Sequence, residues 1–310
     1  MHPIHLTLAS FALAAALSAQ QSHAAAAPAP ASAGATSRDD RAAEALGWRL
    51  GVQAWTFRDR TAFEAIDTAH ALGLKYIELY PGQPLRPDND AKVAVDMPVA
   101  QREALRQKLA DSQVQALAFG VVGFANDEAK AREVFAFAEA MGIRSISCEP
   151  EPDAWDLVER LADQYRIDVA CHDHPKPSRY WNPETVLAAV AHRSQRLGAC
   201  ADTGHWPRSG LDPVASLALL AGRIRSLHFK DIAPADRTGV DQPWGTGAGK
   251  AHAMLAELDR QGFRGLFAIE YETGSGKELE ANVARCIAFF DDEARAFAAQ
   301  HQTPDHGAAR

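Results

Sequence analysis

Residues 143–174, IRSISCEPEPDAWDLVERLADQYRIDVACHDH, contain a short apolar run, an amphipathic stretch and a second short apolar run. The apolar runs Ile143–Cys148 and Ile167–His172 have the length and residue types of buried β-strands. The stretch between them, Asp153–Tyr165, repeats its apolar residues at the spacing of an α-helix. A strand, a helix and a second strand in this order predict two parallel strands joined by a helical crossover.

The same alternation continues on both sides of this unit. Helix starts are marked by Asn182-Pro183 and Asp212-Pro213, in which a capping residue precedes a proline suited to the first helical turn. We expect further strands at Leu50–Trp55, Tyr76–Tyr80, Val114–Phe119, Arg196–Asp202, Ile224–Lys230 and Leu266–Tyr271. Further helices are expected at Thr61–Leu72, Val99–Asp111, Asp127–Met141, Pro183–His192, Pro213–Ala221, Lys250–Gln261 and Lys277–Ala299.

Eight strands, each followed by a helix, are typical of one architecture in particular. They predict an α/β protein with a single (β/α)8 TIM barrel. The alternative is an open, doubly wound sheet, which rarely needs eight such units. No GxGxxG motif follows the first strand, so the sequence favours the barrel.

The first residues differ in composition from the rest of the chain. Leu6–Ala19 is a short apolar run, and Ser22-His23-Ala24 after it has the small residues of a signal-peptidase site. Residues 1–24 are therefore interpreted as a signal peptide for export to the periplasm, with an uncleaved disordered tail as the alternative. We interpret residues 25–47 as an Ala/Pro/Ser-rich linker, residues 48–300 as the barrel domain and residues 301–310 as a disordered tail.

The overall charge and the cysteines exclude several kinds of partner. The formal net charge is −8 at pH 7, and no run of lysine or arginine stands out, so no nucleic-acid partner is expected. No later segment is apolar enough to cross a membrane, so no stable membrane association is expected after processing. We interpret the cysteines as buried thiols, with disulfides as the alternative, because no CxxC pair occurs among Cys148, Cys171, Cys200 and Cys286.

Ionisable residues stand at the carboxyl ends of five expected strands. Because alternate strand residues face opposite sides, Ile146 and Cys148 should face the helices, while Ser145, Ser147 and Glu149 point into the barrel. The active sites of such barrels lie at this rim, so the repeated charge there predicts a functional site. The corresponding inward positions are Ala170/His172/His174, Gly198/Cys200/Asp202, Ser226/His228/Lys230 and Ala268/Glu270.

Three carboxylates and one imidazole on this rim have the chemistry of a metal site. Glu149, Asp202, His228 and Glu270 supply mainly oxygen ligands. Such a set suits one divalent metal ion, with Mn favoured and Mg, Co or Zn as alternatives. The competing interpretation is a buried ion-pair network around Lys230.

Four motifs, in order along the chain, resemble those of the xylose isomerase-like TIM barrels, the superfamily of sugar phosphate isomerases and epimerases. The motifs are Cys171-His172-Asp173-His174-Pro175, Ala201-Asp202-Thr203-Gly204-His205-Trp206, His228-Phe229-Lys230-Asp231 and Ile269-Glu270-Tyr271-Glu272. The resemblance covers nearly all of residues 50–290. It implies that Glu149, Asp202, His228 and Glu270 hold the metal and that His205 contacts the substrate.

A metal flanked by carboxylates can promote proton transfer next to a carbonyl group. We expect a sugar-like hydroxyketone as substrate, with Glu149 and Glu270 moving the proton as base and acid. Lys230 is expected to stabilise developing negative charge, with a salt bridge to Asp231 or Glu272 as the alternative. The predicted catalytic residues are thus Glu149, Glu270, His205 and Lys230.

Several further side chains are candidates for substrate contact. For the two histidines after the fifth strand, substrate contact, metal ligation and orientation of a ligand remain alternatives. Tryptophans could form a sugar-stacking wall, or they could simply pack in the fold. The loop from Gly245 to Lys250 could bind an anion, although chain reversal is favoured. The substrate-binding candidates are His172, His174, Lys176, Trp206, Trp244 and Glu78, with Trp181 as a further ring.

The predicted function is that of a metal-dependent sugar isomerase or epimerase. Abstraction of a C2 proton would also allow lyase chemistry on a 3-keto-glycoside, because the same enediolate can expel a leaving group. Export favours free sugars or glycosides as partners. The alternatives are a non-catalytic periplasmic sugar-binding barrel and an apurinic endonuclease-like metal hydrolase, the second opposed by the acidic charge. The resemblance also suggests a homodimer.

Overall fold

The computed structural model describes residues 38–302 of the 310-residue chain. The predicted signal peptide, residues 25–37 of the predicted linker and residues 303–310 of the predicted tail lie outside this described part. Within residues 38–302, no helix combines the length and the apolar composition needed to cross a membrane. All four cysteines are free and buried.

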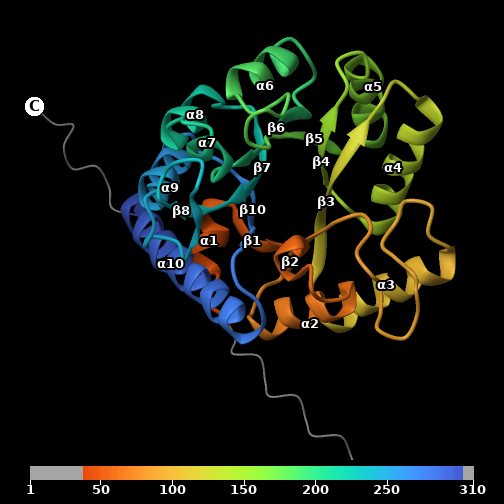
Figure 1. The fold of residues 1–310 in the computed structure, drawn as a ribbon, viewed down its shortest axis with the longest axis horizontal. Helices are drawn as coiled ribbons and strands as arrows, with labels where there is room; N and C mark the ends of the chain where they lie inside the picture. Colours follow the sequence, from red (N-terminus) through yellow and green to blue (C-terminus); the bar gives the residue numbers. More distant parts are fainter. Residues whose placement is uncertain (1–37, 303–310) are drawn as a thin grey trace, which may run out of the picture. The chain divides into compact units, whose positions relative to one another are not determined.

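Eight parallel strands close into a barrel, which confirms the predicted architecture (Figure 1). Around the barrel the strands follow the order β1-β10-β7-β6-β5-β4-β3-β2, and β1 also pairs with β2. Neighbouring strands in the chain are therefore neighbours in space, as expected for repeated βα units. The strands are β1 (Trp48–Gln53), β2 (Tyr76–Leu79), β3 (Gln115–Phe124), β4 (Ser145–Pro150), β5 (Asp168–His172), β6 (Leu197–Asp202), β7 (Ile224–Phe229) and β10 (Gly265–Ile269).

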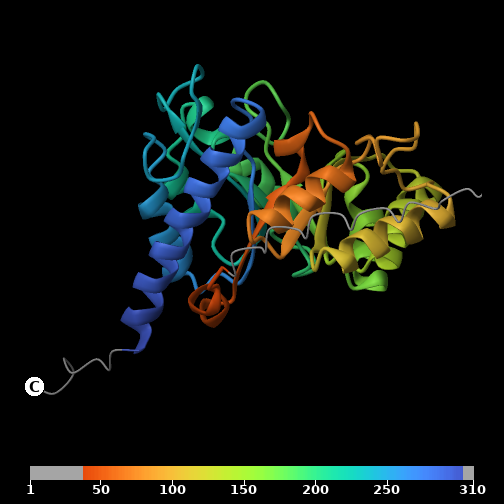
Figure 2. The ribbon, with the colours of Figure 1, turned by 90° about the horizontal axis from the view of Figure 1, so that it is seen from below.

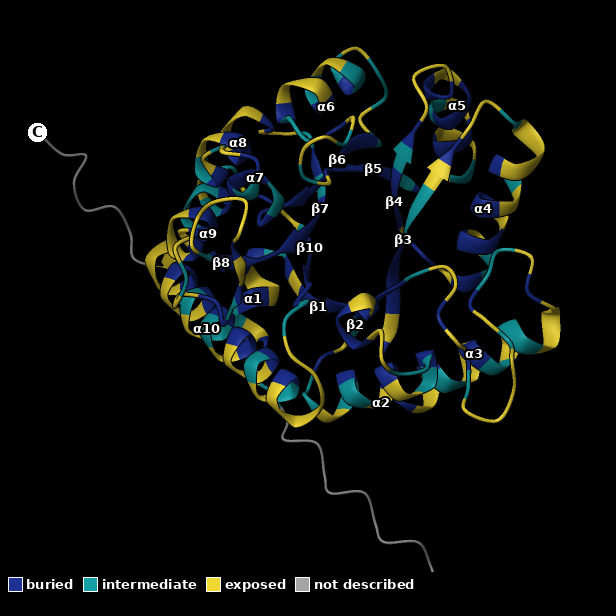
Figure 3. Cartoon of the chain, viewed as in Figure 1, coloured by how far each residue is buried: buried dark blue, intermediate teal, exposed yellow. Residues whose placement is uncertain are grey.

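Helices surround the barrel, with buried faces toward the strands and exposed faces outward (Figure 3). The predicted caps are confirmed: the side chain of Asn182 accepts a hydrogen bond from Glu184 N, and that of Asp212 from Val214 N. Thr61 and Glu64 add a capping box at the first barrel helix. These helices are α2 (Ala62–Ala71), α3 (Val99–Asp111), α4 (Glu128–Met141), α5 (Trp155–Tyr165), α6 (Pro183–Val190), α8 (Pro213–Leu219), α9 (Ala251–Arg260) and α10 (Gly276–Gln302).

The prediction of a linker over residues 25–47 is wrong for the last residues of that range. Residues Arg41–Leu46 form helix α1, whose Ala43 and Leu46 join the core. Arg38 pairs with Asp291 of α10, and α1 lies beside α10 (Figure 2). Alanines in this segment supply a buried helix face. Composition did not reveal the helix, because the same alanines also contribute to the Ala/Pro/Ser-rich average of residues 25–47. Helix α10 likewise runs to Gln302, beyond the predicted start of the tail.

Four short elements were not expected from the sequence. The 3-10 helix η1 (Ala54–Phe57) follows β1, and helix α7 (His205–Arg208) follows β6. After β7, the strands β8 (Asp231–Ala233) and β9 (Val240–Gln242) form an antiparallel pair. These elements are too short to give a periodic pattern. Two of them begin at candidate site residues, because α7 starts at His205 and β8 directly follows Lys230.

The predicted division of each strand into two faces is confirmed. Ile146 and Cys148 of β4 belong, with Leu227 and Phe229 of β7, to the large core cluster that includes the helices. Ala268 of β10, on the opposite strand face, belongs to a separate small cluster. The barrel therefore directs the polar residues of that inner face toward its carboxyl rim.

Candidate metal centre and substrate pocket

Four buried side chains converge at the carboxyl ends of the strands. His172 ends β5, Asp202 ends β6, His228 lies in β7 and Glu270 follows β10. One ligand atom from each lies within 4.8 Å of the others, and all four residues are buried. We call these four residues the buried group. The structure thus brings together three of the four predicted ligands, with His172 in the place predicted for Glu149.

Glu78 of β2 orients one of these ligands. Its Oε2 lies 3.0 Å from Nε2 of His228, and neither side chain is exposed. Nδ1 of His228 then faces Glu270, 3.2 Å from Oε2. A carboxylate behind a histidine fixes the ring and its tautomer, so Glu78 supports the site from behind. Glu78 is not among the residues that line the pocket described below, and its predicted contact with a sugar hydroxyl stays a prediction.

Glu149 instead pairs with the histidines that follow β5. Its Oε1 directly contacts Nδ1 of His174 and lies 3.8 Å from Nδ1 of His172. Burial raises the pKa of Glu149, but the two histidines outweigh this effect and lower the pKa to about 2. The Glu149 carboxylate in turn raises the pKa of His174. Glu149 is therefore ionised at neutral pH.

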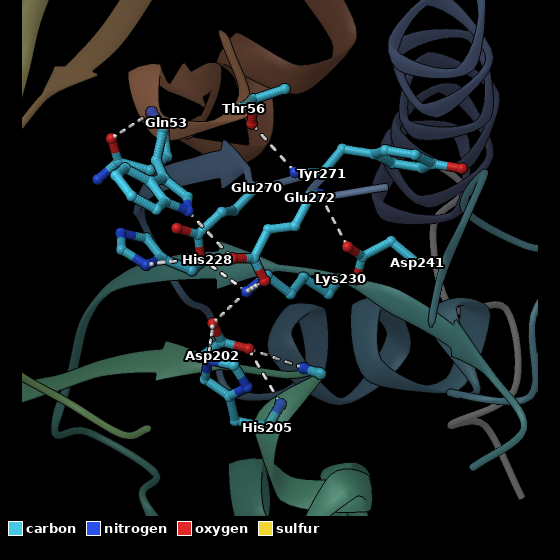
Figure 4. A network of polar contacts seen from close by, with 12 residues as sticks. Gln53, Thr56, Asp202, His205, His228, Lys230, Asp241, Glu270, Tyr271 and Glu272 are labelled. Carbon is cyan, nitrogen blue, oxygen red and sulfur yellow. Dashed lines mark hydrogen bonds and ion pairs between the residues drawn. The ribbon is translucent and has the colours of Figure 1, made fainter. Parts of the chain in front are cut away.

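Lys230 is enclosed by carboxylates (Figure 4). Its Nζ lies 2.8 Å from Oδ2 of Asp202, 2.8 Å from Oε2 of Glu270 and 3.0 Å from Oε2 of Glu272. Burial lowers the pKa of Lys230, but these carboxylates outweigh it and hold the pKa well above its usual value. The ion pairs support the predicted alternative of a salt bridge to Glu272. Three carboxylates around one ammonium leave net negative charge, so Lys230 alone does not neutralise the site.

Helix α7 places His205 against the buried group. Nε2 of His205 lies 3.4 Å from Oδ2 of Asp202. Nη1 of Arg208, one turn later, lies 3.2 Å from Nδ1 of His205. Because a guanidinium can only donate, Nδ1 must accept, and the proton of a neutral ring lies on Nε2. Burial lowers the pKa of His205, which keeps the ring neutral. His205 can therefore donate a hydrogen bond from Nε2.

A pocket of about 380 Å³ opens above these residues. Its lining contains the polar side chains of His172, His174, His205, Glu270 and Glu272. The lining also contains Gln53, Trp55, Tyr80, Pro81, Gly120 and Val121. A pocket lined by both polar groups and aromatic rings suits a sugar ring, which has hydroxyl edges and apolar C–H faces.

Trp55 and Tyr80 were missed in the sequence. Their rings meet edge to face with centroids 5.2 Å apart, and Trp55 is 40% exposed. The indole N–H donates to Oε1 of Glu272 at 3.1 Å. Both residues continue the inward alternation of their strands, Gln53 to Trp55 and Glu78 to Tyr80. Extending the strand-face argument to the first two strands would have found them.

The tryptophans chosen from the sequence lie elsewhere. Trp206 is 1% exposed and Trp244 is 2% exposed, and neither lines the pocket. The Trp244 ring packs against Phe229 and Phe290, with centroids 4.6 and 6.3 Å away. The predicted sugar-stacking role of both rings is therefore wrong, because the core takes up their apolar area.

Lys176 also lies outside the pocket. Its Nζ lies 3.9 Å from the centroid of the Trp181 ring. Lys176 lines a different cavity, formed by the loops after β5, β6 and β8, and is not among the residues around the metal-ligand candidates. Its predicted contact with substrate therefore stays a prediction.

The loop from Gly245 to Lys250 is closed by a carboxylate of the chain itself. The side chain of Asp231 accepts hydrogen bonds from the N–H groups of Gly245, Gly247 and Gly249 at 2.9, 3.0 and 2.8 Å. A Cβ on Gly247 would stand 2.4 Å from Oδ1 of Asp231. The favoured interpretation, chain reversal, therefore holds, and the donors that an external anion would need are already used.

The buried group has the composition of a metal site. Both ring nitrogens of His172 are buried without a hydrogen-bond partner, and so is Nδ1 of His228. Unpartnered buried nitrogens cost free energy, which a metal ion would recover by accepting their lone pairs. Two imidazoles and two carboxylates are a common donor set for Mn and Zn. The residues present therefore fit a divalent metal.

Comparisons with known proteins agree with this fold. Residues 66–293 match the family described as Xylose isomerase-like TIM barrel. The Rhizopine catabolism protein MocC of Rhizobium meliloti is 29% identical over 132 residues, which are 38% of this chain and 40% of that protein. The matched segment thus spans less than half of that relative.

Two solved structures extend the match over the barrel. A protein from Parabacteroides distasonis ATCC 8503 is 32% identical, with a TM-score of 0.66, over 79% of this chain and 99% of that one. The IOLI protein with a binding zinc atom is 15% identical, with a TM-score of 0.63, over 80% and 99% of the two chains, which shows a shared fold. With a family match across most of its barrel, the chain belongs to the xylose isomerase-like TIM barrel family, which comprises sugar isomerases, epimerases and related enzymes.

Proposed function

We propose that this protein is a divalent-metal-dependent enzyme that abstracts a proton next to the carbonyl group of a hydroxyketone sugar. One observation carries the proposal. Two carboxylates and three imidazoles line the same pocket as the aromatic rings of Trp55 and Tyr80. A bound sugar ring would thereby meet both groups that can accept a proton and an aromatic surface.

The buried group would hold the metal. His172, Asp202, His228 and Glu270 offer it two nitrogens and two oxygens, and Glu78 holds the His228 ring in place. When bound, a divalent metal supplies a Lewis acid that polarises the substrate carbonyl and acidifies the adjacent C–H. Mn is the favoured ion, and Zn, Mg and Co are the alternatives.

The chain's own residues would move the proton. Glu149 is ionised at neutral pH and half-buried beside the pocket, so it can accept the proton from carbon. Glu270 lines the pocket and would return a proton to the same or the neighbouring carbon after taking one up from solvent or from a substrate hydroxyl. It must first be protonated, because Lys230 and His228 outweigh the effect of burial and hold its pKa well below the usual value. The Nε2–H of His205 can donate to the substrate oxygen on which negative charge develops. Lys230 would stabilise the negative charge of Asp202, Glu270 and Glu272, the carboxylates with which it forms ion pairs.

The proposed substrate class is an oxidised glycoside, such as a 3-keto-glucoside, that loses its C2 proton as the enediolate forms. Expulsion of the aglycone would then give lyase chemistry, while return of the proton would give epimerisation or isomerisation. The compartment supports this class: residues 1–24 predict export to the periplasm, where free glycosides are more abundant than sugar phosphates.

The experiment is proton NMR of the Mn-loaded protein with a 3-keto-glucoside in D2O. The expected result is loss of the C2 proton signal through exchange with solvent. Chelation of the metal should stop this exchange, and Glu149→Gln should strongly slow it. Release of free aglycone would identify the lyase, and exchange alone would identify the isomerase or epimerase. A C2 signal that persists at substrate-saturating concentrations, with enzyme and metal present, would rule out this substrate class. Ligand binding unchanged in Glu149→Gln, without turnover in either protein, would favour a sugar-binding barrel.

A further inference from the structure

Arg208 joins two segments of the barrel rim through its guanidinium group. It ends the short helix α7, and its side chain is 14% exposed. Its Nη1 lies 3.2 Å from Nδ1 of His205, its Nη2 donates to Oδ1 of Asp241 at 2.9 Å, and its Nε donates to the Gly239 carbonyl at 3.0 Å. Each nitrogen of the guanidinium therefore has a partner, which fixes the orientation of this planar group.

Asp241 is the buried acceptor of this arrangement. It lies in β9 and is 2% exposed. Its Oδ1 accepts from Arg208, and its Oδ2 accepts the backbone N–H of Glu272 at 2.8 Å (Figure 4). The N–H of Asp241 itself donates to Oγ1 of Thr273 at 3.2 Å. Asp241 thereby ties the β8–β9 pair both to α7 and to the segment that follows β10.

Two residues that line the pocket stand at the ends of these contacts. His205 receives the hydrogen bond of Arg208, and Asp241 holds the backbone of Glu272. Arg208 and Asp241 are not among the described residues that line the pocket. They can therefore act on a bound substrate only through the residues that they hold.

The His205 ring needs a partner at Nδ1 to keep one orientation. The terminal torsion of a histidine side chain is broad, so hydrogen bonds decide where the ring nitrogens point. Arg208 supplies a donor at Nδ1, on the opposite side of the ring from Asp202. A free arginine side chain has many rotamers, and the buried carboxylate of Asp241 selects the one that reaches His205.

We propose that Asp241 and Arg208 are positioning residues, which hold the Nε2–H of His205 toward the substrate oxygen on which negative charge develops. Asp241 orients the guanidinium, the guanidinium orients the imidazole, and neither residue touches the substrate. The β8–β9 pair is thereby part of the site, although none of its residues lines the pocket. The effect on catalysis rests on the proposed function, whereas the orientation of the His205 ring does not.

The test replaces the arginine and then supplies its guanidinium from solution. Arg208 also lines the open cavity formed by the loops after β5, β6 and β8, which has a volume of about 630 Å³. A guanidinium ion can therefore reach the vacated place in Arg208→Ala, at concentrations below those that unfold the protein. The matched control is Arg237→Ala, which removes an exposed arginine from the lining of the same cavity.

The first readout is heteronuclear NMR of the His205 ring nitrogens, in the full-length protein with Zn²⁺, which is diamagnetic. His205→Gln assigns the signals. The Nδ1 signal should move in Arg208→Ala, and added guanidinium should return it. Asp241→Asn, which keeps an acceptor oxygen and loses the charge, should move the signal less. Arg237→Ala should leave the signal at its wild-type position, with and without guanidinium.

The second readout is the rate of C2 proton exchange. Arg208→Ala should lower kcat by about tenfold or more with little change in KM, because His205 then donates less well to the developing charge. Guanidinium should restore part of this loss, whereas a purely structural role of Arg208 would give lower stability without rescue. An Nδ1 signal unchanged in Arg208→Ala would overturn the inference. If the signal moves and is rescued but the wild type exchanges no C2 proton, the proposed function fails and the positioning of His205 stands.

Discussion

Nζ of Lys230 lies 2.8 Å from Oδ2 of Asp202, so an ammonium occupies one side of the oxygen that the metal would use. Both side chains are fully buried. Lys230 also pairs with Glu270, a second member of the buried group. The lysine therefore offsets part of the negative charge of the ligands in the metal-free protein and repels the cation that they bind.

Lys230→Met should consequently have opposite effects on folding and on metal binding. The metal-free variant should lose about 3–5 kcal/mol of unfolding free energy, because buried carboxylates lose their cation. Its affinity for Mn²⁺ should rise by roughly tenfold or more, because a repelling charge is gone. Calorimetric titration and urea denaturation, with and without metal, measure the two effects. Lys230→Arg, which keeps the charge, is the control, and weaker metal binding in Lys230→Met would contradict the argument.

The Glu149–His174 pair predicts a pH-dependent stability in the metal-free protein. Glu149 raises the pKa of His174 above its ordinary value of 6.5. The pair's contribution is therefore complete below pH 6.5 and is lost as the pH rises through the raised pKa. Glu149 itself, with a pKa of about 2, stays ionised throughout this window.

The measurement is urea denaturation in the presence of chelator at several pH values between about 6 and 9. The wild type should lose unfolding free energy relative to Glu149→Gln as the pH rises, and NMR of the His174 ring should show a lower pKa in the variant. A pH profile that Glu149→Gln leaves unchanged would show that the pair does not form in solution.

Trp55→Ala should weaken substrate binding more than catalysis. The exposed indole and its edge-to-face contact with Tyr80 offer a stacking surface of about 1 kcal/mol, so KM should rise by roughly fivefold to tenfold with a smaller change in kcat. Trp244→Phe is the matched control. It should lower stability and leave KM unchanged, because that ring packs in the core. A KM effect confined to Trp244→Phe would reverse the assignment.

Asp231→Asn should loosen the glycine loop. The carboxylate accepts three backbone N–H groups through its two oxygens, whereas an amide has one oxygen and would turn its NH2 group toward donors. We expect a loss of about 1–3 kcal/mol in unfolding free energy, measured by chemical denaturation. Asp236→Asn, which alters an exposed carboxylate bonded within its own turn to Thr238, should cost less. Equal losses in the two variants would argue against the role of Asp231.

The repeating units and their inner faces were predictable because both follow from local periodicity. A strand presents alternate residues to opposite sides, so Asp202, His228 and Glu270 had to point inward once the strands were recognised. Caps at Asn182 and Asp212 were predictable for a similar reason, because the side chain bonds to backbone only two or three residues away.

The remaining features depend on contacts between distant segments. No local pattern shows that Phe229 and Phe290 cover the ring of Trp244. The same holds for the pairing of Glu149 with His174 and for the place of Lys230 between Asp202 and Glu270. The sequence by itself determined the barrel and which residues face its rim, because alternation along a strand is a property of the backbone. Only the tertiary structure decided which of these residues touch, because side-chain distances across the rim depend on how the strands close and how their loops pack.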